Sequence, residues 1–157
     1  MIKQGQTLPT GTLSQLTTDG MQQHSTNELF ANKKVALFAV PGAFTPTCSE
    51  AHLPGYIVLA DQLQAKGVDL IACISVNDAF VLDAWAKSQN ASEITMLADG
   101  NASFTKALGL EMDTAGFGGV RSQRYAMVID NGVVTALNVE KQGEFEASTA
   151  ETILATL

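Results

Sequence analysis

The chain has 157 residues, a formal net charge of −7 and 46% hydrophobic residues, which favours one domain, spanning residues 1–157, with a hydrophobic core. With only nine Lys and Arg against 16 Asp and Glu, it is a poor candidate for binding nucleic acid or an anionic membrane. Two cysteines are too few for a disulfide framework and favour a reducing compartment.

The N-terminal half of the sequence alternates between predicted strands and helices. Its elements are, in chain order, an irregular or hairpin-containing lead-in over 1–30, a buried strand over 35–40, a helix over about 46–66, a second buried strand over 68–75 and a helix over 78–89. Pro54-Gly55 lies inside the first helix, so we expect a kink there. Asn77 or Asp78 can cap the second helix.

The C-terminal half ends in a predicted hairpin followed by a helix. Its elements are a strand over 94–97, a short helix over 102–108, a strand over 124–129, a strand over 133–139 and a closing helix over 148–157. The turn Asp130-Asn131-Gly132 is a strong hairpin signal. This order indicates an α/β, thioredoxin-like fold with a mixed central sheet covered by helices on both faces. A small doubly wound sheet is the alternative, and the late hairpin argues against it.

The segment PGAFTPTCSE, residues 41–50, places Cys48 in the first turn of the first predicted helix. Either Thr45 caps this helix, or Thr47 caps it and Glu50 completes a capping box. In both cases the unpaired backbone N–H groups and the helix dipole favour a thiolate. A packed core cysteine is the alternative. Thr45 lies three residues before Cys48 and shares its face of the turn, which favours a reactive site.

A reactive thiol needs more than a low pKa. At pH 7 an ordinary cysteine is about 3% thiolate, and lowering its pKa to about 6 raises that fraction roughly 30-fold. The same shift weakens the nucleophile about 13-fold at a Brønsted slope of roughly 0.45, so the net gain is only about twofold. A cation must therefore polarise the electrophile, and Arg121 and Arg124 are the candidates. Arg124 is favoured because it lies on a predicted core strand, with a structural ion pair as the alternative; Arg121 reads more readily as a solvated loop arginine.

The residues around Cys48 resemble the active-site motif of the peroxiredoxins. The match runs Pro41-x-x-x-Thr45-x-x-Cys48, and the longer string PGAFTPTCSEAHLPGY looks like the type II, peroxiredoxin-5-like branch. The similarity continues through ACISVNDAF, LADG, RYAMVIDNGVV and LNVE, and covers nearly the whole chain from about residue 30. The resemblance implies a thioredoxin fold and the reduction of hydrogen peroxide and alkyl hydroperoxides without a cofactor.

The same resemblance assigns roles to residues of the motif. It implies that Cys48 is the peroxidatic cysteine, which attacks one peroxide oxygen and becomes a sulfenic acid. It also implies that Thr45 hydrogen-bonds the peroxide, that Arg124 holds the thiolate and the peroxide oxygens, and that Pro41 shields the pocket.

We expect Gly42, Phe44 and His52 to complete the substrate pocket. His52 lies one helical turn beyond Cys48 and is therefore placed to face the pocket and orient the arginine, unless it is a packing histidine. His24 reads as a loop residue with no catalytic part. The His and Cys residues are too scattered in the sequence to make a recognisable metal site.

The chain lacks the resolving cysteine that many relatives in this branch carry late in the sequence. The corresponding stretch, 142–148, has none, and Cys73 sits in an apolar strand run typical of an inert buried thiol. Nothing in the sequence brings Cys73 within the roughly 7 Å Cα separation that a disulfide with Cys48 needs. We therefore expect a one-cysteine mechanism in which glutathione, with or without glutaredoxin, recycles Cys48. Thioredoxin is a less favoured reductant.

Other functions and partners follow from the same features. A peroxide sensor or redox relay on this fold is the second hypothesis, whereas the lack of a Cys-x-x-Cys pair disfavours a disulfide oxidoreductase. Type II peroxiredoxins commonly form homodimers, and the segment 115–120 offers an aromatic for such a contact unless it is an ordinary flexible loop. With no secretory signal and no apolar stretch of membrane-span length, we expect a cytoplasmic protein.

Overall fold

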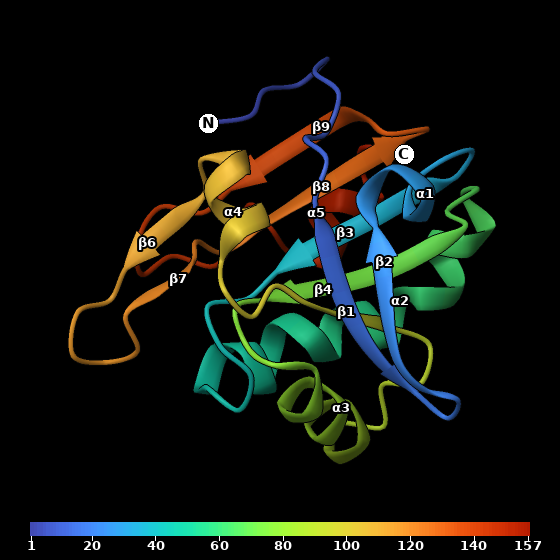
Figure 1. Cartoon of the computed structure of the whole chain (residues 1–157). Helices are drawn as coiled ribbons and strands as arrows, with labels where there is room; N and C mark the ends of the chain where they lie inside the picture. Colours follow the sequence, from blue (N-terminus) through green and yellow to red (C-terminus); the bar gives the residue numbers. More distant parts are fainter.

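A seven-stranded mixed sheet forms the centre of the computed structural model, which describes residues 1–157 (Figure 1). Its strand order is β2-β1-β5-β4-β3-β8-β9. These strands are β1 (Thr12–Thr17), β2 (Gly20–Ser25), β3 (Lys34–Ala39), β4 (Leu70–Ser75), β5 (Thr95–Ala98), β8 (Tyr125–Asp130) and β9 (Val133–Val139). The three central strands β3, β4 and β5 run parallel, and β8 and β1 pair antiparallel at either side. The predicted mixed sheet is confirmed.

Helices cover both faces of this sheet. They are α1 (Thr26–Leu29), the π-helical turn η1 (Cys48–His52), α2 (Leu53–Ala65), α3 (Ala79–Ser88), α4 (Ser103–Leu108) and α5 (Ala150–Leu154). Side chains of α2, α3 and α5 pack in one buried cluster, while α4 and the N-terminal residues pack in a second. The thioredoxin-like layout with helices on both faces is therefore confirmed. None of these helices combines the length and the apolar character needed to cross a membrane.

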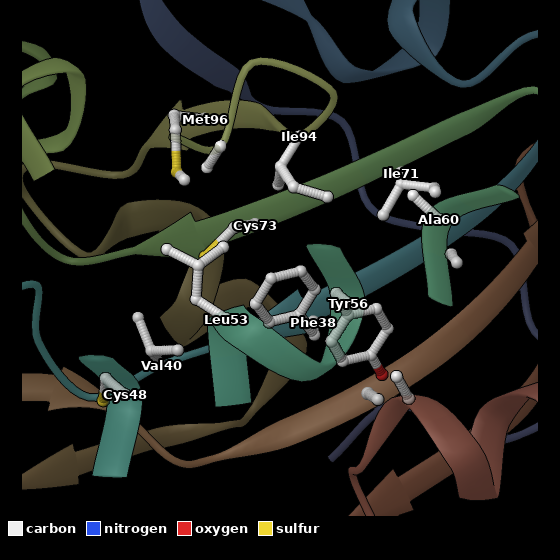
Figure 2. Close-up of a cluster of buried hydrophobic side chains, with 14 of the residues drawn as sticks. Phe38, Val40, Cys48, Leu53, Tyr56, Ala60, Ile71, Cys73, Ile94 and Met96 are labelled. Atoms are coloured by element: carbon white, nitrogen blue, oxygen red, sulfur yellow. The ribbon is translucent and has the colours of Figure 1, made fainter. Parts of the chain in front are cut away.

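The period-two alternation of the central strands divides the core between the two faces. On β3, Phe38 points to the α2 side and Leu37 to the α4 side. Figure 2 shows the α2 side, where the Tyr56 ring of α2 stacks on Phe38 with centroids 4.0 Å apart and an interplanar angle of 6°. Cys48 lies in this same cluster and is fully buried. The thiol therefore sits at one end of the main hydrophobic core.

The hairpin of β8 and β9 is the one that the sequence predicts. Asp130 pairs with Val133, so the loop consists of Asn131 and Gly132. Both loop residues have positive φ, 48° and 79°, as a tight type I′ turn requires. At the other end of the hairpin Tyr125 pairs with Val139. The residues just outside this pair, 124 and 140, therefore meet at one end of the sheet.

The helix expected over about 46–66 differs from the prediction in where it is irregular. No break occurs at Pro54-Gly55; α2 passes through both, and Pro54 lies near its start, directly after η1. The irregularity lies one turn earlier, in η1, where the Leu53 N–H bonds the Cys48 carbonyl five residues back. The expected irregularity is therefore found about one turn before Pro54-Gly55 rather than at it.

Two further expectations need correction. The closing helix is shorter than 148–157: α5 covers Ala150–Leu154 and is capped by Thr149, whose hydroxyl accepts from the Thr152 N–H. A small two-stranded ribbon of β6 (Glu111–Asp113) and β7 (Val120–Ser122) was not predicted and extends from the body in Figure 1. Each of its strands has only three residues, too few for a periodic pattern to be read.

Candidate active site

The loop between β3 and η1 is held by side chains at the end of β4. The Ser75 hydroxyl donates its one hydrogen to Asn77 Oδ1 at 2.6 Å and lies 3.2 Å from the Val40 carbonyl oxygen. Asn77 Oδ1 also accepts the Ala43 N–H at 3.0 Å. Phe44 then adopts φ +65°, a conformation that bulky residues rarely take and that costs about 1–3 kcal/mol. Asn77 therefore does not cap α3; Asp78 does, accepting the Val81 N–H.

Neither of the expected side-chain caps forms at the start of the Cys48 helix. Thr47 has helical backbone angles and its side chain makes no capping bond, so the capping box with Glu50 is absent. The Thr45 hydroxyl donates instead to the Gly42 carbonyl at 2.7 Å. Because its hydrogen is used in this bond, the Thr45 oxygen presents only lone pairs to a neighbouring group.

Arg124 joins Cys48 to His52. Its Nη2 donates to Cys48 Sγ at 3.1 Å, and its Nη1 lies 2.9 Å from His52 Nδ1. Arg124 lies one residue before β8, Cys48 begins η1 and His52 ends it. The structure therefore brings together three residues that the sequence analysis selected, although they come from segments 72 or more positions apart.

The environment of His52 fixes its protonation. Its Nε2 lies 3.0 Å from the Ser148 carbonyl oxygen, which can only accept, so Nε2 carries the hydrogen and Nδ1 accepts from Arg124. Burial, with the charge of Arg124 as the second cause, lowers the pKa of His52 to about 3. His52 is therefore a neutral acceptor that holds one side of the guanidinium.

The C-terminal segment supplies contacts that the sequence analysis missed. The Phe145 ring meets the His52 ring edge-on with centroids 5.1 Å apart, and the guanidinium carbon of Arg124 lies 5.8 Å from the centre of the Phe145 ring. The Ser148 carbonyl also accepts the Tyr56 hydroxyl at 3.0 Å. Phe145 and Ser148 gave no signal in the sequence, because only the folding of the chain brings them next to His52.

A second missed contact supports the turn that carries Cys48. The indole N–H of Trp85 on α3 donates to the hydroxyl of Ser49 at 3.0 Å. Trp85 is fully buried, so its polar group needs this partner.

A groove of about 770 Å³ opens beside the guanidinium. Pro41, Thr47, Arg124 and Phe145 line it, together with residues of the β6–β7 ribbon and of the loop after β9. The other expected pocket residues lie elsewhere: Gly42 is buried beneath Thr45, His52 is buried behind the arginine, and Phe44 is 56% exposed outside the groove lining.

Cys73 is fully buried on β4, where it pairs in register with Phe38. Burial first, and the nearby Cys48 second, raise the pKa of the Cys73 thiol well above its usual value. Both cysteines are free, and in Figure 2 the side chains of Val40 and Leu53 are drawn between them. This environment is that of a packed, unreactive thiol.

The remaining candidates have structural contacts. Arg121 was expected to be a solvated loop arginine, but it is a half-buried residue of β7. Its Nη1 donates to the Val76 carbonyl at 2.7 Å and its Nε to the Gly118 carbonyl. His24 lies on β2 rather than in a loop and bonds the Gln15 side chain. No group of three or more His, Cys, Asp or Glu side chains is arranged to hold a metal ion.

Comparison with known proteins identifies the family. Residues 3–154 match the family model described as Redoxin. The protein named Peroxiredoxin-2C of Oryza sativa subsp. japonica is 53% identical over 156 residues, covering 98% of this chain and 96% of that protein. The chain belongs to the peroxiredoxins. Its relatives of the peroxiredoxin-2 group set it in the type II branch.

Solved peroxiredoxin structures agree with the fold. Reduced Prx3 of Vibrio vulnificus, solved in complex with hydrogen peroxide, is 78% identical, with a TM-score of 0.98 and 99% of both chains covered. The antioxidant protein of Plasmodium falciparum, described as a 1-Cys peroxiredoxin, is 31% identical, with a TM-score of 0.90 and coverage of 97% and 96%. As a peroxiredoxin, the chain is a thiol-dependent peroxidase that acts on peroxides.

Proposed function

We propose that Cys48 is the peroxidatic cysteine of this peroxiredoxin. The Cys48 thiolate attacks one peroxide oxygen in line with the O–O bond, which breaks as the S–O bond forms. The distal oxygen takes a proton and leaves as water or alcohol, and Cys48 becomes a sulfenic acid. The bond from Arg124 Nη2 to Cys48 Sγ is the single observation that carries this proposal.

In this proposal Arg124 supplies the electrophilic assistance that a low thiol pKa cannot. Its guanidinium has one donor on the sulfur and another on His52, so its plane is fixed before peroxide arrives. Preorganised donors of this kind stabilise the charge that develops on the oxygens as the O–O bond breaks. Neutral His52 supports that role because an imidazolium would repel the arginine.

Thr45 and Pro41 complete the proposed pocket. With its hydrogen given to the Gly42 carbonyl, the Thr45 oxygen is ready to accept the O–H of the attacked peroxide. This bond would orient the peroxide with its O–O axis toward the sulfur. Pro41 lines the groove beside Arg124, where it would keep water from the thiolate.

We propose that an external thiol, glutathione with or without glutaredoxin, recycles Cys48. The only other cysteine, Cys73, is fully buried in β4, which supports a one-cysteine cycle. A first thiol attacks the sulfenic sulfur and releases water, giving a mixed disulfide; a second thiol releases the Cys48 thiol and an oxidised disulfide. Because Cys48 is fully buried, the first turn must open for this exchange. Such recycling suits a reducing compartment such as the cytoplasm.

A homodimer is the oligomeric state that we propose. The aromatic side chains of Phe44, Phe80 and Phe117 are 56%, 64% and 74% exposed, and large apolar side chains that gather on a surface can mark a protein interface. Sedimentation of the wild type and of Phe117→Ser tests this: the wild type should sediment as a dimer, and a monomeric wild type would contradict it.

Following peroxide loss with catalytic protein and excess glutathione tests the recycling proposal. We expect many turnovers per subunit, retained by Cys73→Ser and abolished in Cys48→Ser. A single turnover per subunit would instead indicate a peroxide sensor that passes its oxidation to a partner protein. Turnover that requires Cys73 would contradict the one-cysteine cycle.

A further inference from the structure

Glu140 is a buried carboxylate next to the candidate site that the proposed chemistry does not use. It follows β9 directly and is 8% exposed. Its backbone N–H donates to the Arg124 carbonyl at 3.0 Å, so the end of the hairpin fixes the two residues to each other. The Arg124 side chain reaches Cys48, whereas the Glu140 side chain turns to the loop that follows it.

Four hydrogen bonds tie the Glu140 carboxylate to that loop. Oε1 accepts the Ala147 N–H at 3.0 Å, and Oε2 accepts the Glu146 N–H at 2.9 Å. Oε2 also accepts both the N–H and the hydroxyl of Ser148, at 2.8 Å and 2.6 Å. Burial raises the pKa of the Glu140 carboxyl, but these bonds, with those from Ser148 the strongest, outweigh burial and leave it below its usual value. The carboxylate therefore accepts all four bonds in its charged form at neutral pH.

The position of Ser148 that this carboxylate fixes is the one that holds His52. The Ser148 carbonyl accepts from His52 Nε2 and from the Tyr56 hydroxyl, both at 3.0 Å. Its backbone N–H and hydroxyl, on the other side, are held by Glu140. A continuous path of hydrogen bonds thus runs from Glu140 through Ser148, His52 and Arg124 to the sulfur of Cys48.

We infer that Glu140 is a positioning residue for peroxide reduction, which acts by fixing Ser148 so that His52 holds Arg124 on the Cys48 sulfur. The inference rests on the roles proposed above for Cys48 and Arg124. Glu140 touches neither of the reacting atoms. It also fixes the loop that carries Phe145, whose ring contacts both His52 and Arg124.

A carboxylate is needed here because all four groups that face it are donors. A glutamine has one oxygen and one NH₂ group. In Glu140→Gln, one carboxylate oxygen is replaced by NH₂, so a donor faces the donors of the loop on that side of the clamp, by which we mean the four hydrogen bonds to the Glu140 carboxylate. A buried N–H or O–H that loses its acceptor is costly, so the loop is expected to move until these donors bond another acceptor. A displacement of about 1 Å at a catalytic group can cost up to about 100-fold in rate.

A quenched-flow assay of the first oxidation tests the inference. Reduced protein is mixed with hydrogen peroxide, the remaining Cys48 thiol is alkylated, and intact mass gives the second-order rate constant. We expect Glu140→Gln to lower this constant between about 10-fold and 100-fold. Ser148→Ala removes only the shortest of the four bonds, so it should lower the rate constant less than Glu140→Gln does. It also keeps the test possible if Glu140→Gln does not fold, because three of the four bonds remain.

Two comparisons separate positioning from a loss of stability. Thr149→Ala removes the α5 cap in the same C-terminal segment but none of the four bonds to the Glu140 carboxylate, so it should lower the stability and leave the rate constant unchanged. In a His52→Leu background the hydrogen-bond path is already cut and only the Phe145 contact with Arg124 remains, so Glu140→Gln should reduce the rate constant by a much smaller factor than in the wild type. Effects that multiply in the double variant, or a normal rate in Glu140→Gln, would overturn the inference.

The same assay, together with peroxide turnover, distinguishes this inference from the proposed site. If Arg124→Met is oxidised as fast as the wild type, or if Cys48→Ser still turns over peroxide with excess glutathione, the proposed site itself fails. If Arg124→Met is slow and Cys48→Ser is inactive but Glu140→Gln and Ser148→Ala are normal, only the role of Glu140 fails.

Discussion

The stability of the folded protein should fall as the pH falls below neutral, because His52 can take up a proton only when the chain unfolds. The folded protein keeps His52 neutral, since burial and the charge of Arg124 lower its pKa to about 3, against an ordinary value of 6.5. Between these two pH values the unfolded chain binds a proton that the folded protein does not. The free energy of unfolding must therefore fall as the pH falls through this window.

The size of this effect follows from the one proton. The slope approaches about 1.4 kcal/mol per pH unit once the pH is well below 6.5 and still above the folded pKa. Integrated between about pH 7.5 and about pH 5, it amounts to about 2 kcal/mol. This window avoids the titration of carboxylates such as Glu140, whose lowered pKa removes stability only at more acidic pH.

Urea denaturation at the two pH values measures this loss. The Cys48→Ser variant is the suitable background, because it cannot be oxidised at position 48 during the measurement. His52→Gln should remove most of the pH dependence, whereas His24→Gln, which removes the other histidine, should keep it. A His52→Gln variant whose stability still falls by about 2 kcal/mol would refute the reasoning that His52 is held neutral.

Three substitutions test other parts of the structure. Thr45→Val, which keeps the shape but loses the oxygen, should slow Cys48 oxidation about 10- to 100-fold in stopped flow, whereas Thr45→Ser should stay near the wild type. Arg124→Lys should lose about 100-fold in the same assay, because an ammonium cannot hold both His52 and the sulfur in one plane; an unchanged rate would show that charge alone suffices. Asp78→Ala should cost about 1 kcal/mol of stability in urea, through the lost α3 cap, with normal peroxidase activity.

The sheet could be predicted because its signals are local. The continuous apolar run of β3 and the Asn131-Gly132 turn of the β8–β9 hairpin each specify their structure within a few residues. Cys48 could be selected for the same reason, since its place at a helix start is set by the turn before it. The π-helical turn η1 could not be predicted, because it depends on how the chain accommodates Pro54 one turn later.

The support of the candidate site could not be predicted, because it is made by contacts between distant segments. Glu140, Phe145 and Ser148 read as ordinary residues of a polar loop, and only the fold sets Ser148 against His52, 96 positions earlier. Arg124 was preferred to Arg121 because it lies next to a core strand, and the structure places its Nη2 3.1 Å from Cys48 Sγ. Arg121 was nevertheless misread, since its partner is a backbone carbonyl 45 positions away.

In the proposed cycle Cys48 alone is oxidised by peroxide, and it remains a sulfenic acid until an external thiol reacts with it. Treating the reduced protein with one equivalent of hydrogen peroxide in the presence of dimedone, followed by peptide mass spectrometry, tests this most directly. We expect one dimedone adduct per chain, on the peptide that contains Cys48, with Cys73 still a free thiol. An adduct on Cys73, or a disulfide between Cys48 and Cys73 in place of the adduct, would contradict it.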